Sequence, residues 1–141
     1  MISFKLFFED ALGLIETVTF PELGPVDAKV DSGNGAYNVL HGVDIKGDWR
    51  GVLGQWIHFK TINDKTLHKR VEEFIDINIG SGNVEKRPVV LFDIVIGDKK
   101  YPKTPFSIAD REQNEQKVLL GKDFIEKLGG IIDVTKTNNV S

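Results

Sequence analysis

The sequence predicts an all-β fold with one short helix near its C-terminal end. Fourteen glycines and five prolines separate short runs rich in Val, Ile, Phe and Thr, a pattern typical of strands joined by turns. Residues 74–79 and 92–96 alternate apolar and polar side chains, which favours sheets with one solvent-exposed face. We expect one domain over residues 1–141, with its core at about 12–135 and a polar tail at 136–141.

The individual elements follow from hydrophobic pattern and turn residues. Each expected strand is a short run rich in β-branched or aromatic residues between turn signals. Residues 121–130 instead place Phe124, Ile125 and Leu128 on one helical stripe, and Gly129 and Gly130 supply a C-terminal stop. In chain order, the expected strands cover residues 14–20, 26–30, 39–45, 55–61, 71–79, 89–96, 105–108, 117–120 and 131–134.

Composition excludes several classes of protein. Eighteen basic and twenty-one acidic residues give a net charge of −3, whereas nucleic-acid-binding domains usually carry a basic excess. No apolar run approaches the roughly 20 residues of a membrane span, and residues 1–10 lack the features of a signal peptide. The absence of cysteine excludes disulfides, thiol nucleophiles and cysteine-ligated zinc. We therefore expect a cytoplasmic protein that binds neither nucleic acid nor membrane.

The clearest chemical signal is the turn Asp31-Ser32-Gly33, which follows the run 26–30. A carboxylate at a strand end, followed by a hydroxyl and then glycine, suits a rigid loop that presents the carboxylate in a cleft. Two such carboxylates about 3 Å apart share one proton. One then activates a water while the other polarises the scissile carbonyl. Asp-Ser-Gly is also a common turn tripeptide, so the motif alone favours a structural role.

A second segment favours a catalytic role for the Asp31 turn. Residues 117–125 form a short apolar run that enters Gly121 and then the expected helix. Together with the Asp31 turn, this segment resembles the retropepsin-like aspartic proteases, in which an Asp-Thr/Ser-Gly loop precedes a hydrophobic-hydrophobic-Gly-Arg-Asn/Asp segment. The closer resemblance is to bacterial and phage proteins labelled ATP-dependent zinc proteases, found beside ribosomal-protein glutamate ligases. Over roughly residues 12–135, the matching segments are 14–16, 28–33, 40–41, 85–90, 108–111 and 118–124.

The resemblance implies a closed, barrel-like retropepsin domain and a set of site residues. The sequence departs from the family pattern at four positions. Ser32 stands where Thr is usual, and Asn34 stands where a small residue such as Ala is usual. Lys122 replaces the usual Arg, and Gly35 replaces the acid that pairs with that Arg in retroviral enzymes. Arg111 is available to rebuild the ion pair. The implied site residues are catalytic Asp31, its loop residues Ser32, Gly33 and Asn34, the helix entry Leu120, Gly121, Lys122 and Asp123, and the supporting residues Asp110 and Arg111.

Each chain supplies half of the implied site. Among the aspartates, only Asp31 lies in an Asp-Ser/Thr-Gly context, so a two-carboxylate mechanism needs two chains, and twofold symmetry places Asp31 against its own copy. The resemblance therefore implies a homodimeric aspartic endopeptidase without cofactor or metal, acting on a protein or peptide in the cytoplasm of a bacterium or of a phage-infected host. By family association, glutamate-tailed proteins and a phage-encoded target are its candidate substrates.

Two other functions also fit the residues. A catalytically silent binding or assembly module would keep the protease-like fold, as Asn34 and Gly35 suggest. A zinc hydrolase would instead use histidine ligands. His41, His58 and His68 lack metal-ligand spacing, and surface or half-buried strand positions suit them better.

Two further stretches are open to interpretation. Residues 47–56 hold Trp49 and Trp56 among glycines, where a flap over a cleft could lie. We favour the alternative that both rings pack a hairpin, because tryptophan area is mostly buried in cores. Basic residues at positions 65–70 look like a solvated strand edge, which protects against sheet-to-sheet pairing.

Overall fold

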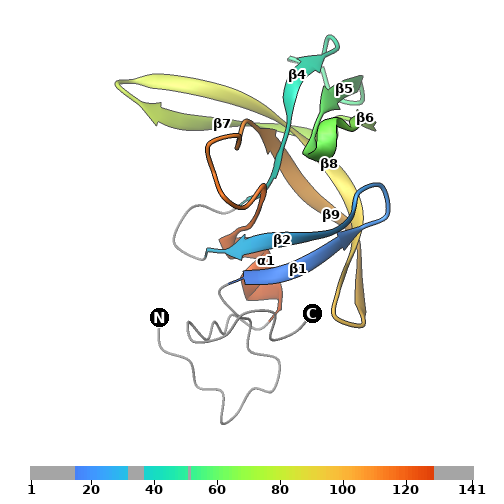
Figure 1. Ribbon diagram of the computed structural model, residues 1–141. Helices are drawn as coiled ribbons and strands as arrows, with labels where there is room; N and C mark the ends of the chain where they lie inside the picture. The colour runs from blue at the N-terminus through green and yellow to red at the C-terminus, as the bar shows by residue number, and fades with distance from the viewer. Residues whose placement is uncertain (1–14, 32–36, 51, 129–141) are drawn as a thin grey trace.

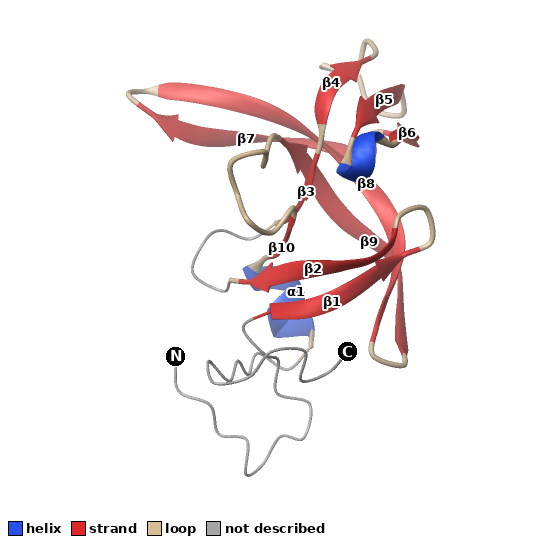
Figure 2. Cartoon of the chain, in the orientation of Figure 1, coloured by secondary structure: helices blue, strands red, loops and turns tan. Residues whose placement is uncertain are grey.

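The computed structural model describes residues 15–31, 37–50 and 52–128, and most of these residues lie in strands (Figure 1). The predicted all-β class is confirmed. Figure 2 shows the two helical segments of this part of the chain, a single 3-10 turn at Ile62–Asp64 and the short helix α1 (Lys122–Lys127). The strands are β1 (Ile15–Phe20), β2 (Gly24–Val30), β3 (Asn38–His41), β4 (Val43–Lys46), β5 (Trp56–Lys60), β6 (Thr66–Arg70), β7 (Glu73–Gly80), β8 (Asn83–Ile96), β9 (Lys99–Ala109) and β10 (Val118–Leu120).

Seven strands form one sheet in the order β1-β2-β10-β3-β9-β8-β7. An additional antiparallel contact between β1 and β8, at Thr19 and Val95, closes this sheet into a ring from which β7 projects. Two of the pairs are parallel, β2 with β10 and β3 with β9. Because parallel strands end at the same edge of a sheet, the residues that follow β2 and β10 lie next to each other.

A second sheet has the order β4-β5-β6 and comes from the chain between β3 and β7. Gly42 separates β3 from β4, where the sequence analysis expected one strand over 39–45. A side chain at Gly42 would collide with Ile108 and approach a ring carbon of Phe59 to 2.9 Å. Only glycine therefore fits at the point where the chain passes from the larger sheet to the smaller one. Residues 66–70 of the basic segment 65–70 form β6, which is an edge strand of the smaller sheet.

Strands β7 and β8 form a long hairpin that projects beyond the ring (Figure 1). Strand β8 begins at Asn83 and β9 at Lys99, well before the starts expected at residues 89 and 105. Residues 81–85 are all exposed. A ribbon with two solvated faces has no hydrophobic alternation, so the sequence pattern did not mark these strand ends.

Both sheets contribute to one hydrophobic core. Phe20, Phe92 and Phe106 of the larger sheet pack with ring centroids 5.2–5.7 Å apart. Phe59 of the smaller sheet and Trp49 of the loop before it are each 1% exposed and belong to the same cluster. Burial of each such ring stabilises the fold by about 1.5–3 kcal/mol, so the smaller sheet is held to the ring by core packing.

Helix α1 carries the apolar stripe that the sequence predicted. Phe124 and Ile125 are buried, and Phe124 meets Tyr101 edge-on with ring centroids 5.4 Å apart. The expected glycine stop and the expected strand at 131–134 lie outside the described residues. Within the described part of the chain, no helix is long and apolar enough to cross a membrane.

Candidate active site

Asp31 directly follows β2, at the edge where β2 and β10 end side by side. The pairing of Val30 with Leu120 sets the register of these strands, and the Asp31 backbone N–H donates to the Leu120 carbonyl oxygen at 3.1 Å. Val30 and Leu120 are buried, whereas the Asp31 side chain is 22% exposed. The fold thus fixes the backbone of Asp31 against a buried strand and leaves its carboxylate accessible.

A buried asparagine, Asn38, holds the helix entry in place. Gly121 donates its backbone N–H to Asn38 Oδ1 at 2.8 Å, and Asn38 Nδ2 donates to the Pro105 carbonyl oxygen at 3.1 Å. Asn38 is 3% exposed, and a buried amide bonded at both ends has one orientation. The sequence analysis missed this residue, because one polar side chain just before a predicted strand resembles an ordinary turn residue.

The remaining helix-entry residues, Lys122 and Asp123, lie at the surface. Lys122 and Asp123 are exposed on the first turn of α1. Asp123 lines a cavity of about 240 Å³ together with Tyr37. Their predicted part in the site therefore rests on the resemblance and remains a prediction. The predicted loop residues Ser32, Gly33 and Asn34 lie outside the described residues.

Asp31 lies among cationic side chains. Lys29 Nζ is 3.6 Å from Asp31 Oδ2. Burial lowers the pKa of the Arg111 guanidinium, the charge of Arg87 lowers that pKa further, and the charge of Asp31 raises it. Arginine nevertheless stays protonated at neutral pH. Arg111 thus feels the charge of Arg87 on β8 and that of Asp31 at the end of β2.

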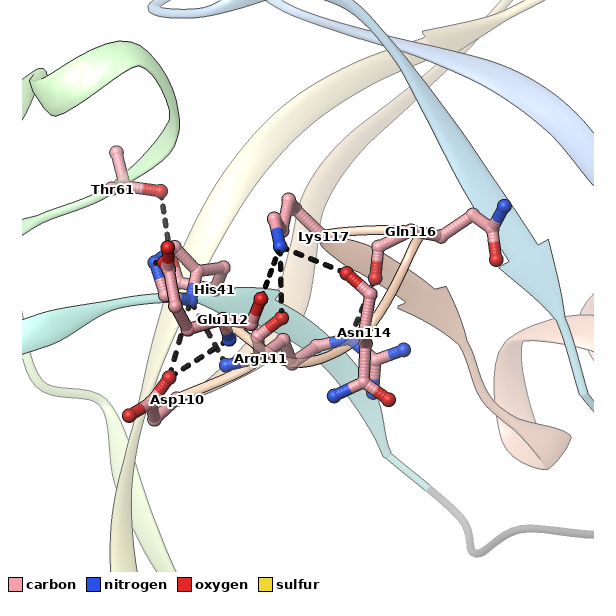
Figure 3. Close-up of polar contacts among 8 residues, drawn as sticks. All are labelled: His41, Thr61, Asp110, Arg111, Glu112, Asn114, Gln116 and Lys117. Carbon is pink, nitrogen blue, oxygen red and sulfur yellow. Dashed lines mark hydrogen bonds and ion pairs between the residues drawn. The ribbon is translucent and has the colours of Figure 1, made fainter.

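Arg111 belongs to the loop between β9 and β10, which folds around one ammonium group (Figure 3). Lys117 Nζ donates to the carbonyl oxygens of Arg111, Glu112 and Asn114 at 2.8–3.2 Å. Arg111 Nε donates to the Gln116 carbonyl oxygen at 3.1 Å. An ammonium whose three N–H donors all meet carbonyl oxygens of one loop fixes the course of that loop.

His41 joins this loop to β3 (Figure 3). Its ring Nδ1 accepts the backbone N–H of Arg111 at 2.9 Å, an arrangement that requires Nδ1 to be unprotonated. Nε2 lies 3.4 Å from Glu112 Oε2. Asp110 Oδ1 is 3.9 Å from Nδ1 but accepts the Glu112 backbone N–H at 2.8 Å, so Asp110 supports the loop itself. The expectation that His41 is on the surface or half-buried was wrong, because it is 4% exposed.

The β7–β8 hairpin is linked to β3 and acts on the Arg111 loop through its charge. Tyr37 donates its hydroxyl to Glu73 Oε1 at 3.2 Å, which connects the start of β3 to the base of the hairpin. Burial raises the pKa of Tyr37, and the charge of Glu73 raises it further. On β8, Arg87 Nε donates to Glu85 Oε2. The hairpin is therefore tethered to β3 through Glu73, and its Arg87 contributes a positive charge that acts on Arg111.

The two tryptophans of residues 47–56 lie in different environments. Trp49 packs in the core as expected, whereas Trp56 is 55% exposed on β5, contrary to the expectation that both rings pack a hairpin. Trp49 lines the inner wall of a cavity of about 450 Å³ between β4, the hairpin and the end of β9. Arg87 and Asp110 also line this cavity, which offers room for a side chain beside the Arg111 loop.

The fold places Asp31 next to the Leu120-Gly121 segment. The resemblance described above implied that these two segments meet. A family model described as RimB-like, "Retropepsin-like aspartic endopeptidase RimB", matches residues 11–139. This chain belongs to the RimB-like family. The retropepsin-like resemblance is thereby confirmed, while the closer likeness to proteins labelled ATP-dependent zinc proteases remains a prediction.

A solved structure is also similar to this RimB-like chain. It is the crystal structure of protein Lpg0085, of unknown function (DUF785), from Legionella pneumophila subsp. pneumophila str. Philadelphia 1. The two chains are 27% identical and superpose with a TM-score of 0.70, over 89% of this chain and 94% of the Legionella chain. A comparison with curated proteins gives no significant match.

Proposed function

We propose that this RimB-like chain is an aspartic endopeptidase that hydrolyses peptide bonds with two Asp31 carboxyl groups, one from each chain of a homodimer. One observation carries the proposal. The Asp31 backbone is hydrogen-bonded to Leu120 at the paired ends of β2 and β10, within a chain whose family model describes retropepsin-like aspartic endopeptidases. One chain offers one such carboxylate, so the second must come from a symmetric partner.

The chemistry follows from two carboxyl groups that share one proton. The ionised carboxylate takes a proton from a bound water as the water oxygen attacks the carbonyl carbon of the scissile peptide. The protonated partner gives its proton to the carbonyl oxygen at the same time. The tetrahedral intermediate then collapses as a carboxyl group protonates the amine nitrogen and the C–N bond breaks. The products are a carboxylic acid and an amine, and activity is highest at mildly acidic pH, where the pair carries a single proton.

Charge near the site supports an acidic substrate, in line with the glutamate-tailed proteins suggested by family association. Lys29 lies 3.6 Å from the Asp31 carboxylate, and the charge of Asp31 also acts on the Arg111 guanidinium. Carboxylate side chains of a substrate form strong charge-assisted hydrogen bonds with guanidinium groups. The cavity lined by Arg87 has room for such a side chain.

The experiment uses a mixture of peptides from a denatured proteome and identifies new N-termini by mass spectrometry. The wild-type protein should cleave, and Asp31→Asn should lower the rate by at least about a hundredfold with an unchanged circular dichroism spectrum. Asp110→Asn and Asp123→Asn are matched controls that remove a carboxylate elsewhere, and both should retain most activity. Cleavage by well-folded Asp31→Asn at the wild-type rate would rule out the aspartic mechanism.

A further inference from the structure

The outward face of the three-stranded sheet carries a row of exposed aromatic and basic side chains. Register places Trp56 opposite Arg70 and His58 opposite His68 on the paired strands β5 and β6. Burial alternates along β5, so that Trp56, His58 and Lys60 are exposed while the residues between them belong to the core. All of these side chains therefore stand on the solvent side of the sheet.

The three rings of this face contact one another. The imidazoles of His58 and His68 stack with centroids 4.7 Å apart and an angle of 29° between their planes. The Trp56 indole lies 5.0 Å from the His68 ring, and Trp56 is 55% exposed. A large aromatic ring at this exposure is unusual, because its area is normally buried. The row leaves π surface in contact with water.

Cations surround these rings. Lys46 pairs with His58 across β4 and β5, and Lys60 and Arg70 are exposed on the same face. Arg70 is 3.7 Å from Glu72, in an exposed ion pair that contributes little to stability. Strands β4, β5 and β6 together carry four cationic residues, Lys46, Lys60, Lys69 and Arg70, and one acidic residue, Asp44. The net charge of −3 is thus an average that does not describe this face.

We propose that this face binds single-stranded nucleic acid, with bases stacked on its rings and phosphates beside its cations. Proteins that bind single strands without strong sequence preference combine exposed aromatic side chains with a positively charged track, often on a β-sheet. The proposal replaces the expectation, drawn from net charge, that the chain binds no nucleic acid. We call this face the stacking platform, defined by Lys46, Trp56, His58, Lys60, His68 and Arg70.

An acidic peptide is the main competing occupant. Its carboxylates would pair with the three cations of the stacking platform. They would make no use of the exposed rings of Trp56, His58 and His68. Bases use both kinds of group, because every base has a π face. Figure 1 shows β5 and β6 well apart from the end of β2, so the inference does not depend on the proposed peptidase.

The test measures anisotropy of labelled oligouridine and oligothymidine of about ten nucleotides at low salt, with RNA and DNA as separate arms. Wild type should bind at least one of them. Trp56→Ala should weaken binding roughly 5- to 150-fold, whereas Trp56→Phe, which keeps a π face, should lose much less. Because Trp49 is buried, quenching of tryptophan fluorescence should report stacking on Trp56.

Charge variants complete the test. Lys60→Gln should lower the slope of log affinity against log salt by about 0.7, and Lys100→Gln on the exposed start of β9 should leave it unchanged. Asp31→Asn should bind as wild type does, which separates this inference from the proposed function. Absence of binding, binding indifferent to Trp56→Ala, or equal binding of an oligoglutamate of the same length would each overturn the proposal.

Discussion

The two sheets share one core but expose their polar groups in different ways. Around Asp31, the neighbouring polar groups are buried and bonded in one arrangement, as with Asn38 and His41. On the three-stranded sheet, the polar and aromatic side chains stand in water on a regular row. A site that holds a carboxylate in one geometry needs a fixed backbone and buried supports. The face of the three-stranded sheet instead follows from the alternation of exposed and buried residues along β5.

The largest effect is expected where the two sheets meet. Gly42→Ala places a methyl group against Ile108 and Phe59, which should lower the free energy of unfolding by about 3 kcal/mol, measured by urea denaturation. Truncation of the colliding side chain in Gly42→Ala/Ile108→Ala should relieve part of this clash, so the double variant should lose less than the sum of the single losses. If the two single losses of stability simply add in the double variant, the collision with Ile108 is not the cause of the loss in Gly42→Ala.

A smaller effect is expected for the support of the Arg111 loop. His41→Leu leaves the partly buried Arg111 N–H without its acceptor and should cost about 2 kcal/mol of stability. It should also slow peptide hydrolysis, because the charges of Arg111 and Asp31 interact. The matched variant His41→Asn keeps an acceptor oxygen near the position of Nδ1 and should recover part of both losses. Binding to the stacking platform should not change in either variant, and equal losses in both would contradict the role of Nδ1.

The smallest effect concerns the tether between β3 and the hairpin. In a Tyr101→Phe background Tyr37 is the one remaining tyrosine, and its ultraviolet titration should give a pKa above the ordinary value of about 10. Burial is the larger cause and Glu73 the second, so Glu73→Gln should lower the pKa only in part.

The sign of the accompanying stability change follows from linkage. Because the pKa of Tyr37 is raised in the folded state, its contribution to stability is complete below about pH 10 and disappears as pH rises through the folded pKa. Tyr37→Phe should therefore make alkaline unfolding less steep. If Glu73→Gln leaves the pKa of Tyr37 unchanged, the hydrogen bond between Tyr37 and Glu73 is not formed in solution.

The sequence marked the residues at the paired ends of β2 and β10 better than the residues that support them. Asp31 and the Leu120-Gly121 segment carry a family pattern, and the parallel pairing of β2 with β10 brings them together. Asn38 and His41 were not recognised as supports, because their importance comes from partners 70 or more residues away, such as Gly121 and Arg111. A contact at such separation leaves no local signature in a single sequence.

The fold shows the same division. The strands with a buried face, such as β1 and β5, were located to within a residue or two. The solvated ends of the β7–β8 hairpin were missed, since no apolar face marks them. The break at Gly42 was missed because it depends on the close approach of Ile108 and Phe59, two residues that the sequence places far from it.

The proposal that each chain supplies half of a catalytic site can be tested by mixing wild-type and variant chains. Wild-type protein is mixed with increasing excess of Asp31→Asn under conditions where subunits exchange, and peptide cleavage is followed at a fixed wild-type concentration. Activity should fall as one-carboxylate heterodimers form, and specific activity should also fall on dilution as dimers dissociate. If activity is unchanged by the excess variant and constant over a dilution range where sedimentation shows monomers, each chain works alone and the half-site proposal is wrong.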